Sequence, residues 1–546
     1  MSDVPSRLPA RPSLEHLRKQ AKERLADRRT ANPETTLAKA QFQIACEYGF
    51  DSWPKLVHHV EARQSSPHGL NAAPPFYQID WKNNSISVWQ PLSDHDWDRI
   101  FDVMRELQLT GLNAGGHMTD AALGRFSRLD RVTYLDLDGS TAVTDEGLAH
   151  LARMPQLEDL NVSGWHCPVT DRGLAVLQHL KRLRRFQMSW LQQVTDAGIA
   201  HLRDCSHLQS VNLMGTHTGD GAMQALAGKP ALREFRSGRG VTDAGLLLLH
   251  EFPIFKTWHG GEVQYALMSP DASPNHLLID GPFTNRGLAS LVGLDGLFGL
   301  TTFWHSQSYD ADGLASVAQL PRLGFLSCAG EMCDDVAMRH IAEMPHLRML
   351  LAQGTIATDA GFAALSRSQS IEYLWGRECA NLGTQGFVAL SAMPALRGLA
   401  VSCKNVDDDA LASLPRFPAL RELMPMDVQD DGFRHVGHCD ALEALWCMYC
   451  RDTTDLATGH VAGLSRLTTY YAGQAKITDR SLETLGTMTS LERVRLWNTP
   501  GVTNAGIAAL ARLPRLREVG LEMLSGVTRE AAALFPPHVR VTFWNR

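Results

Sequence analysis

A nine-residue pattern recurs along most of this chain at a nearly constant interval. It contains Thr-Asp, a small residue two positions later and a final Leu, as in VTDEGLAHL at 143–151 and VTDAGIAHL at 194–202. The small residue occurs 17 times from Ala122 to Ala531. Neighbouring copies are 22–26 residues apart, except for one step of 42 between Gly245 and Gly287. A unit this short cannot bury an apolar face alone, so neighbouring units must stack to form a shared core.

Each unit carries a second motif, Leu-x-x-Leu-x-Leu, as in LEDLNV at 157–162. The alternation at its end predicts a half-buried strand. The Gly-Leu-x-x-Leu segment of the first motif has helical spacing, and its Thr-Asp pair can cap that helix. A strand and a helix every 22–26 residues are typical of a leucine-rich repeat. The predicted fold class is therefore α/β, a leucine-rich-repeat solenoid with parallel inner strands and outer helices.

One unit allows a narrower comparison. CDALEALWCMYCRDTTD at 439–455 resembles the cysteine-containing subclass of leucine-rich repeats, which occurs in F-box adaptor proteins and in some bacterial repeat proteins. The resemblance covers roughly residues 108–546 and implies a horseshoe. Cys447 stands where the subclass has an inward Leu.

Residues 1–63 contain no repeats and form a predicted N-terminal helical module. We expect helices at 14–27 and 37–48 and a third from Ser52 to about 63. The segments LPARPSLEHLRKQAKERL and GFDSWPKLVHHVEA resemble the short module that precedes ankyrin repeats in many bacterial proteins, which implies a bacterial chain but no particular activity.

Residues 64–75 are rich in Ser, Pro, Gly and Asn and are a predicted linker. Residues 76–116 should cap the solenoid, with strands at 76–80 and 85–90, a helix that Ser93 and Asp96 open as a capping box, and a first inner strand at 109–115. The array then runs over 117–546. It includes an irregular insertion near 260–282 between strands near 255–259 and at 276–280, and a capping strand at 538–544.

Composition excludes several classes of protein. A net charge of −7 gives no reason to expect nucleic acid as a partner, because phosphate binding needs a basic surface. No stretch approaches the roughly 18 uncharged apolar residues of a membrane span. The start of the chain has no apolar signal region, and ten Cys in 546 residues are sparse. We therefore expect reduced thiols and a cytoplasmic protein.

The sequence contains no convincing catalytic or metal-binding motif. Cys447 and Cys450, with His435, His438 and Cys439 nearby, have the residue types of a zinc site, but Cys439 and Cys450 occupy the repeat's own cysteine positions. The aspartates at 407–409 and 430–431 align with the helix start, where carboxylates favour the positive dipole end. We expect no enzyme, no catalytic residue, no metal and no cofactor.

The informative surface is the inner face of the strands. Side chains alternate across a strand, so residues beside the inward leucines point away from the core. In early repeats they are polar, as at Asp136 and Asn161, whereas after the long step they become apolar and aromatic. The predicted binding residues form a continuous strip: Phe303, Phe325, Met349, Tyr373, Trp375, Arg377, Met424, Trp446, Met448, Tyr471 and Trp497.

The sequence thus predicts a non-enzymatic scaffold that binds a protein or peptide along the concave face of its C-terminal half. One alternative is a substrate-recognition adaptor for a ubiquitin ligase, which the F-box resemblance implies. Another is a small-molecule or enzymatic site lined by Trp375, Arg377, Cys403, Trp446 and Tyr471. The strip could also be covered by the N-terminal helices, the 260–282 loop or a second copy, and a one-residue register shift would make it core.

Overall fold

The computed structural model describes residues 14–31, 36–48, 53, 56–57, 76–258, 263–269, 276–302 and 308–544. The chain divides into two compact units. The first comprises Met1–Val241, Glu251–Ile254 and Gln264–Ala272, and the second comprises Thr242–His250, Phe255–Val263 and Ser273–Arg546.

The first unit begins with two helices, α1 (Leu14–Ala31) and α2 (Leu37–Glu47). Leu17 and Ala21 of α1 and Ile44 and Ala45 of α2 belong to one small buried cluster, which Leu56 completes. The two helices confirm the sequence prediction, while most of the predicted third helix lies outside the described residues.

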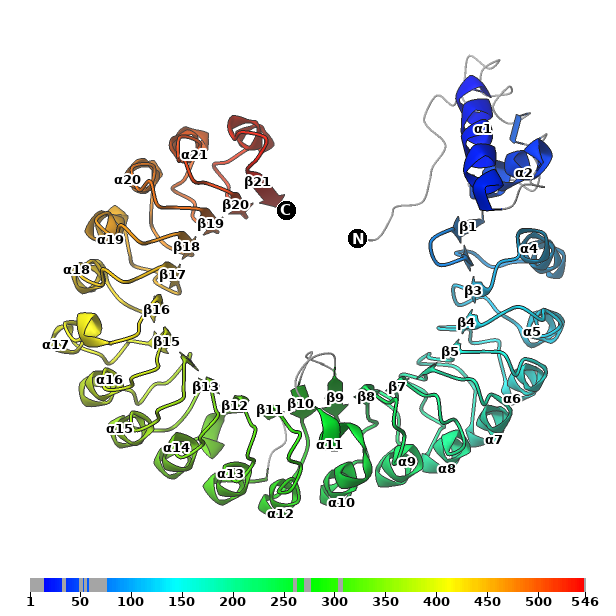
Figure 1. Ribbon diagram of the computed structural model, residues 1–546, viewed down its shortest axis with the longest axis horizontal. Coiled ribbons are helices and arrows are strands. Elements are labelled where there is room, and N and C mark those ends of the chain that lie inside the picture. Colours follow the sequence, from blue (N-terminus) through cyan, green and yellow to red (C-terminus); the bar gives the residue numbers. More distant parts are fainter. Residues whose placement is uncertain are drawn as a thin grey trace. The chain divides into compact units, whose positions relative to one another are not determined.

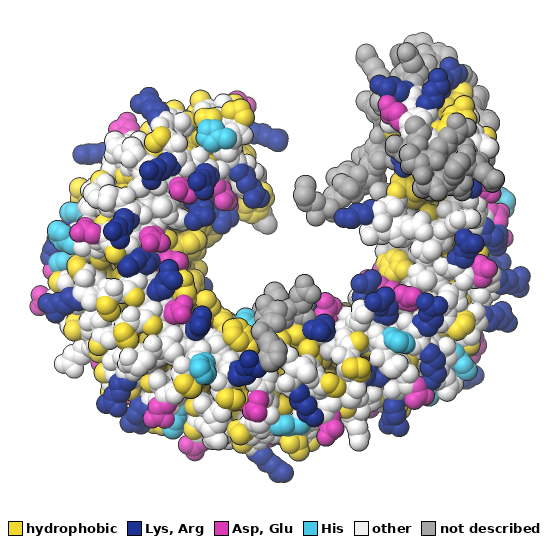
Figure 2. Space-filling view, in the orientation of Figure 1, with side chains coloured by type: hydrophobic (Ala, Val, Ile, Leu, Met, Phe, Trp, Pro, Cys, Tyr) yellow, Lys and Arg dark blue, Asp and Glu magenta, His cyan; other side chains and the backbone are white. Residues whose placement is uncertain are grey.

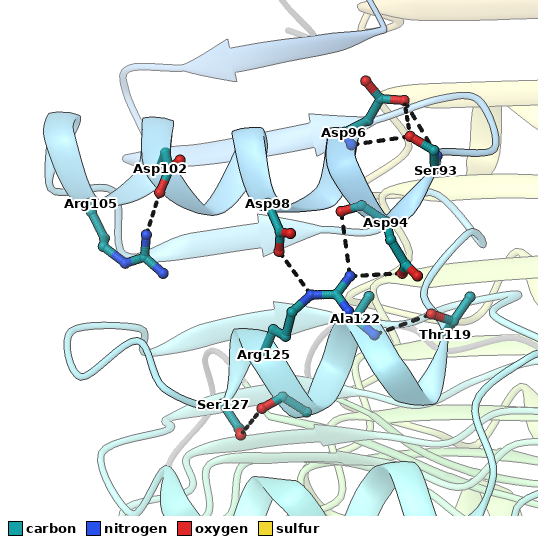
Figure 3. Close-up of polar contacts among 11 residues, drawn as sticks. Ser93, Asp94, Asp96, Asp98, Asp102, Arg105, Thr119, Ala122, Arg125 and Ser127 are labelled. Carbon is teal, nitrogen blue, oxygen red and sulfur yellow. Dashed lines mark hydrogen bonds and ion pairs between the residues drawn. The ribbon is translucent and has the colours of Figure 1, made fainter.

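A hairpin and a long helix follow. Strands β1 (Tyr77–Asp80) and β2 (Ser85–Val88) pair antiparallel, and β2 pairs in parallel with β3 (Gly111–Asn113). Helix α4 (Asp94–Leu107) connects β2 to β3 and begins with the predicted capping box. In this box Ser93 Oγ accepts from the backbone N–H of Asp96, and the Asp96 carboxylate accepts from the backbone N–H of Ser93. Figure 3 shows this box and the ion pairs of Arg125 with Asp94 and Asp98, which join α4 to the first repeat helix.

The repeats of the first unit alternate one short strand with one short helix (Figure 1). The strands are β4 (Tyr134–Asp136), β5 (Asp159–Asn161), β6 (Arg185–Gln187), β7 (Ser210–Asn212), β8 (Glu234–Arg236) and β9 (Gln264–Leu267). The helices are α5 (Asp120–Phe126), α6 (Asp145–Ala149), η1 (His150–Arg153), α7 (Asp171–Leu174), η2 (Ala175–His179), α8 (Asp196–Ile199), η3 (Ala200–Leu202) and α9 (Asp220–Leu226).

The second unit continues the same alternation. Its strands are β10 (His276–Ile279), β11 (Gly299–Thr302), β12 (Phe325–Ala329), β13 (Met349–Gln353), β14 (Tyr373–Gly376), β15 (Gly398–Ser402), β16 (Glu422–Met426), β17 (Ala444–Met448), β18 (Thr469–Gly473), β19 (Arg493–Trp497), β20 (Glu518–Glu522) and β21 (Arg540–Trp544).

The helices of the second unit lie outside its strands (Figure 1). They are α10 (Asp243–Leu248), η4 (Leu249–Glu251), α12 (Asn285–Ala289), α13 (Ala311–Val317), η5 (Gly330–Met332), α14 (Asp335–Ala342), α15 (Asp359–Leu365), α16 (Thr384–Leu390), α17 (Asp408–Leu411), η6 (Leu414–Arg416), η7 (Asp430–Gly432), α18 (Phe433–Val436), α19 (Asp455–Val461), α20 (Asp479–Leu485), α21 (Asn504–Leu510) and η8 (Arg529–Leu534).

Within each unit the repeat strands pair in parallel with a constant register. Leu135 of β4 pairs with Leu160 of β5, and Leu374 of β14 pairs with Leu399 of β15. Each repeat therefore adds its leucines to a core that only neighbouring repeats share. This arrangement confirms the predicted leucine-rich-repeat solenoid of parallel strands on one side and helices on the other.

The predicted strand near Phe255–His259 is wrong. A short helix, α11 (Ile254–Thr257), occupies most of that segment, and the strand of this repeat is β9. Phe255 and Trp258 are both buried and their rings meet edge to face, a contact that spacing of three residues produces on a helix. The apolar run therefore resembles a strand in sequence but packs with helical periodicity. His259 lies outside the described residues.

The Thr and the Asp of the repeat motif make different hydrogen bonds. The Thr144 side chain caps α6 by accepting from the backbone N–H of Glu146, as predicted. The aspartate of the preceding repeat, Asp120, instead accepts from the backbone N–H of Thr144 at 2.8 Å and from its hydroxyl at 2.7 Å. Asp455 with Thr478 and Asp479 with Thr503 repeat this arrangement. In these repeats the motif therefore ties one helix start to the next.

Candidate functional site

The predicted binding residues that belong to described strands, from Phe325 of β12 to Trp497 of β19, lie on the strand face opposite the core of the second unit. The intervening leucines, from Leu326 of β12 to Leu445 of β17, are at most 2% exposed. The outward residues form rows across the strands: Tyr373, Gly398 and Glu422 are in register, and so are Trp375, Ala400 and Met424. Figure 2 shows hydrophobic side chains gathered on this inner side of the second unit.

A hollow opens where β15 carries small outward residues. Gly398 and Ala400 lie between the large side chains of β14 and those of β16 and β17. The hollow has a volume of about 410 Å³ and is called the apolar groove below. Its lining residues are Met349, Leu351, Tyr373, Leu374, Trp375, Gly398, Leu399, Ala400, Glu422, Leu423, Met424, Trp446 and Met448.

The missing side chain at Gly398 positions one wall of the apolar groove. A Cβ built there would lie 2.3 Å from the Tyr373 ring, so Tyr373 can lie flat across β15 only because this residue is glycine. Burial, together with the negative charge of nearby Glu422, raises the pKa of Tyr373. Glu422 is the charged residue of the lining.

A second, more polar hollow of about 290 Å³ adjoins the apolar groove and shares Glu422 and Trp446 with it. The Trp446 and Tyr471 rings meet edge to face at 5.6 Å. Beyond them stand Arg493, Arg495 and Glu518, and the Arg495 guanidinium pairs with Glu522 at 2.7 Å. The surface thus changes from apolar to mixed charge across neighbouring strands.

Arg377 and Tyr449 contact each other beside the groove, above the ends of β14 and β17. Arg377 Nη1 donates to the Tyr449 hydroxyl at 3.2 Å, and its guanidinium lies 4.8 Å from the ring centroid. Tyr449 also lines a separate polar crevice of about 530 Å³, together with Cys403, Asp427 and Asp452. The five residues of the predicted small-molecule site therefore do not line one pocket.

The structure separates the predicted strip into parts. Six of its residues line the apolar groove: Met349, Tyr373, Trp375, Met424, Trp446 and Met448. Tyr471 lines the polar hollow. Phe325 stacks instead on His276 at 4.0 Å, and Trp497 packs over Gly473. Phe303 lies outside the described residues.

Sequence reasoning included Arg377 but missed three other charged residues of this surface. Glu422, Arg493 and Glu518 occupy the outward position just before an inward Leu or Val, as Tyr373 does. Aligning that one position through all repeats would have found them. The search for apolar residues passed over them because each is an ordinary surface residue by type.

The cysteines and aspartates that were considered as metal ligands occupy positions set by the repeat. Burial raises the pKa of Cys447 and of Cys439 to about 12, and the Cys450 thiol donates to the Pro425 carbonyl. His435 Nε2 lies 3.0 Å from Asp408 Oδ1. Asp407 caps α17, as predicted. Within the described part of the chain, no three His, Cys, Asp or Glu side chains are grouped to hold a metal ion, and no helix is long and apolar enough to cross a membrane.

The parallel strands, outer helices and constant register define the fold as a leucine-rich-repeat solenoid. No protein-family model matches it. The putative RNA-binding protein EEED8.10 of Caenorhabditis elegans is 27% identical over 158 residues, which are 28% of this chain and 21% of that protein. The match thus spans about a fifth of that relative's length.

Solved structures of low identity resemble the fold. An internalin, InlF, of Listeria monocytogenes has a TM-score of 0.32 at 16% identity, with 72% of this chain and 88% of that chain covered. The yeast Rad7 and Elc1 complex gives 0.34 at 13%, covering 81% and 94%. The TLR13–ssRNA13 complex gives 0.46 at 12%, covering 82% and 71%. At these identities the likeness concerns the fold alone.

Proposed function

We propose that this protein is a non-enzymatic scaffold that binds a protein or peptide segment through the apolar groove. The observation that supports the proposal is the hollow of about 410 Å³ between Trp375 and Trp446, whose lining is apolar except for Glu422 and the Tyr373 hydroxyl. Exposed apolar patches on soluble proteins commonly mark interaction sites. Trp, Tyr and Met are enriched at such sites, and anchors of the partner fill pockets between them.

The charges beside the groove favour a protein partner over a nucleic acid. Arg493 and Arg495 alternate there with Glu422, Glu518 and Glu522, and Arg495 is already paired with Glu522. A phosphate backbone needs a surface on which positive charge prevails. A mixed polar rim around an apolar centre is instead typical of protein interfaces. We infer that a bulky apolar side chain of the partner enters the groove above Ala400.

A peptide-display selection tests this function without a known partner. A random peptide library is selected on the full chain, and binders are counter-selected on Ala400→Trp, whose indole would fill the hollow. A second control, Ser210→Trp, places the same bulk on the outward face of β7 in the first unit. Both variants are first checked for wild-type thermal unfolding.

We expect enriched peptides to share a bulky apolar residue, to lose binding to Ala400→Trp and to keep binding to Ser210→Trp. Enrichment that survives Ala400→Trp, or the absence of any enrichment on the folded wild type, would contradict the proposed use of the groove.

A further inference from the structure

Strand β21 leaves one backbone edge open. It pairs in parallel with β20, and no further strand pairs with it among the residues described. Arg540 N donates to Arg517 O at 2.7 Å, and Trp544 O accepts from Met523 N at 2.8 Å. In a parallel ladder alternate residues bond to the same neighbour. Arg540, Thr542 and Trp544 therefore bond to β20, while the N–H and C=O groups of Val541 and Phe543 point to the open edge.

The side chains at this edge also leave apolar surface uncovered. Val541 and Phe543 are in register with Val519 and Leu521 of β20, which are fully buried core residues. Val541 and Phe543 themselves remain partly exposed. Leu534 of the adjoining helix η8 is 46% exposed. Val541, Phe543 and Leu534 therefore present apolar surface beside the strand edge.

The corresponding edge of the first unit is protected. There β1 belongs to an antiparallel hairpin, and helix α2 packs against it. Natural proteins usually cover a sheet edge in this way, because unpaired strand groups invite another strand. The contrast singles out β21 as a surface built to receive a strand.

We propose that β21 pairs antiparallel with β21 of a second copy of this chain, about a two-fold axis through Thr542. This proposal does not depend on the function proposed for the groove. In that register Val541 of one copy faces Phe543 of the other, so that both sets of outward N–H and C=O groups exchange hydrogen bonds. The side-chain pairs are a β-branched residue with an aromatic one, which is favourable across strands.

Charge supports the antiparallel, self-paired arrangement. Arg540 is the one charged residue of β21, and the register places it opposite Trp544 rather than opposite a second Arg540. A parallel pairing would set the two guanidinium groups side by side, which is destabilising. The same strand is therefore complementary to itself when one copy is turned around.

Sedimentation equilibrium of the full chain tests the proposal. We expect a reversible dimer with a dissociation constant between about 1 and 100 µM, as for a small interface. Val541→Pro removes an N–H that points to the open edge, where proline is tolerated. It should weaken dimerisation at least about tenfold and leave thermal unfolding of the monomer nearly unchanged. Ser210→Trp, on the first unit, is the control for substitution as such.

Amide hydrogen exchange of the wild type gives a second measurement that needs no variant. The Val541 and Phe543 amides should exchange more slowly as concentration rises through the dissociation constant, while the Thr542 amide should not change because β20 already holds it. A wild type that remains monomeric above the expected range would overturn the proposal. So would a dimer that survives Val541→Pro or leaves the exchange at these two amides unaltered.

Discussion

At the scale of single residues, the repeat motif is a joint between helices. The carboxylate of one repeat accepts from the backbone N–H and hydroxyl of the next threonine, as Asp479 does from Thr503 at 2.7 and 2.6 Å. The motif glycine makes room for that carboxylate: a Cβ at Gly506 would lie 2.3 Å from Asp479 Oδ1. The glycine is thus required by a close approach between two repeats.

Removing one carboxylate of this joint should destabilise the array locally. We expect Asp479→Ala to lower the free energy of unfolding by about 1.5–3 kcal/mol, because two charge-assisted hydrogen bonds are lost and a backbone N–H loses its partner. Asp479→Asn should cost less, since Asn504 already makes the equivalent contacts to Thr528 at 3.0 and 2.9 Å. Urea unfolding of the three proteins measures the difference. Equal stability of Asp479→Ala and wild type would refute this role.

At the scale of the element, each strand separates a core face from a groove face. Leu374 is 2% exposed and stacks between Leu350 and Leu399 at the floor of the apolar groove, whereas Trp375 next to it is only half-buried and forms a wall of the groove. The alternation of a strand imposes this separation, and it is the reason that one residue's shift in register would exchange the two roles.

The difference between these two neighbours is measurable. Leu374→Ala should cost about 2–5 kcal/mol of stability, because it leaves a cavity between repeats. Trp375→Ala should cost clearly less, since its side chain bounds an open hollow and its loss creates no closed cavity. Thermal unfolding of both variants compares them directly. Loss of stability by Trp375→Ala equal to that of Leu374→Ala would mean that the groove wall belongs to the core.

The same alternation explains how much could be predicted from the sequence. The local sequence pattern recurs in every repeat. It predicts the strands, the helices, the capping box at Ser93 and the outward direction of Trp375 and Trp446. The prediction of a strand near Phe255–His259 was wrong because a short apolar run fits either a helix or a strand. The groove itself depends on which large and small side chains meet across strands. The contacts of Tyr373 with Gly398 and Glu422 join residues of different repeats, and periodicity within one repeat does not contain them.

At the scale of the whole molecule, both units build their cores from the inward residues of parallel strands, but their outward surfaces differ. On the first unit, polar residues such as Asp136, Asn161 and Gln187 occupy the outward strand positions. On the second, the apolar groove lies among large side chains next to a rim of mixed charge. The core fixes the inward residues of every repeat, so the outward residues are where the two units are free to differ. This difference is the reason that the proposed binding site lies on the second unit.

Calorimetric titration of a display-selected peptide tests that assignment most directly. The wild type should bind with a negative heat-capacity change, the mark of buried apolar surface. Trp446→Ala should weaken binding by about 30-fold or more, the effect of losing an anchor worth about 2 kcal/mol. Trp165→Ala, which removes a 56% exposed tryptophan of the first unit, should leave the affinity unchanged. Equal affinities for wild type and Trp446→Ala, or a loss confined to Trp165→Ala, would contradict the assignment of binding to the apolar groove.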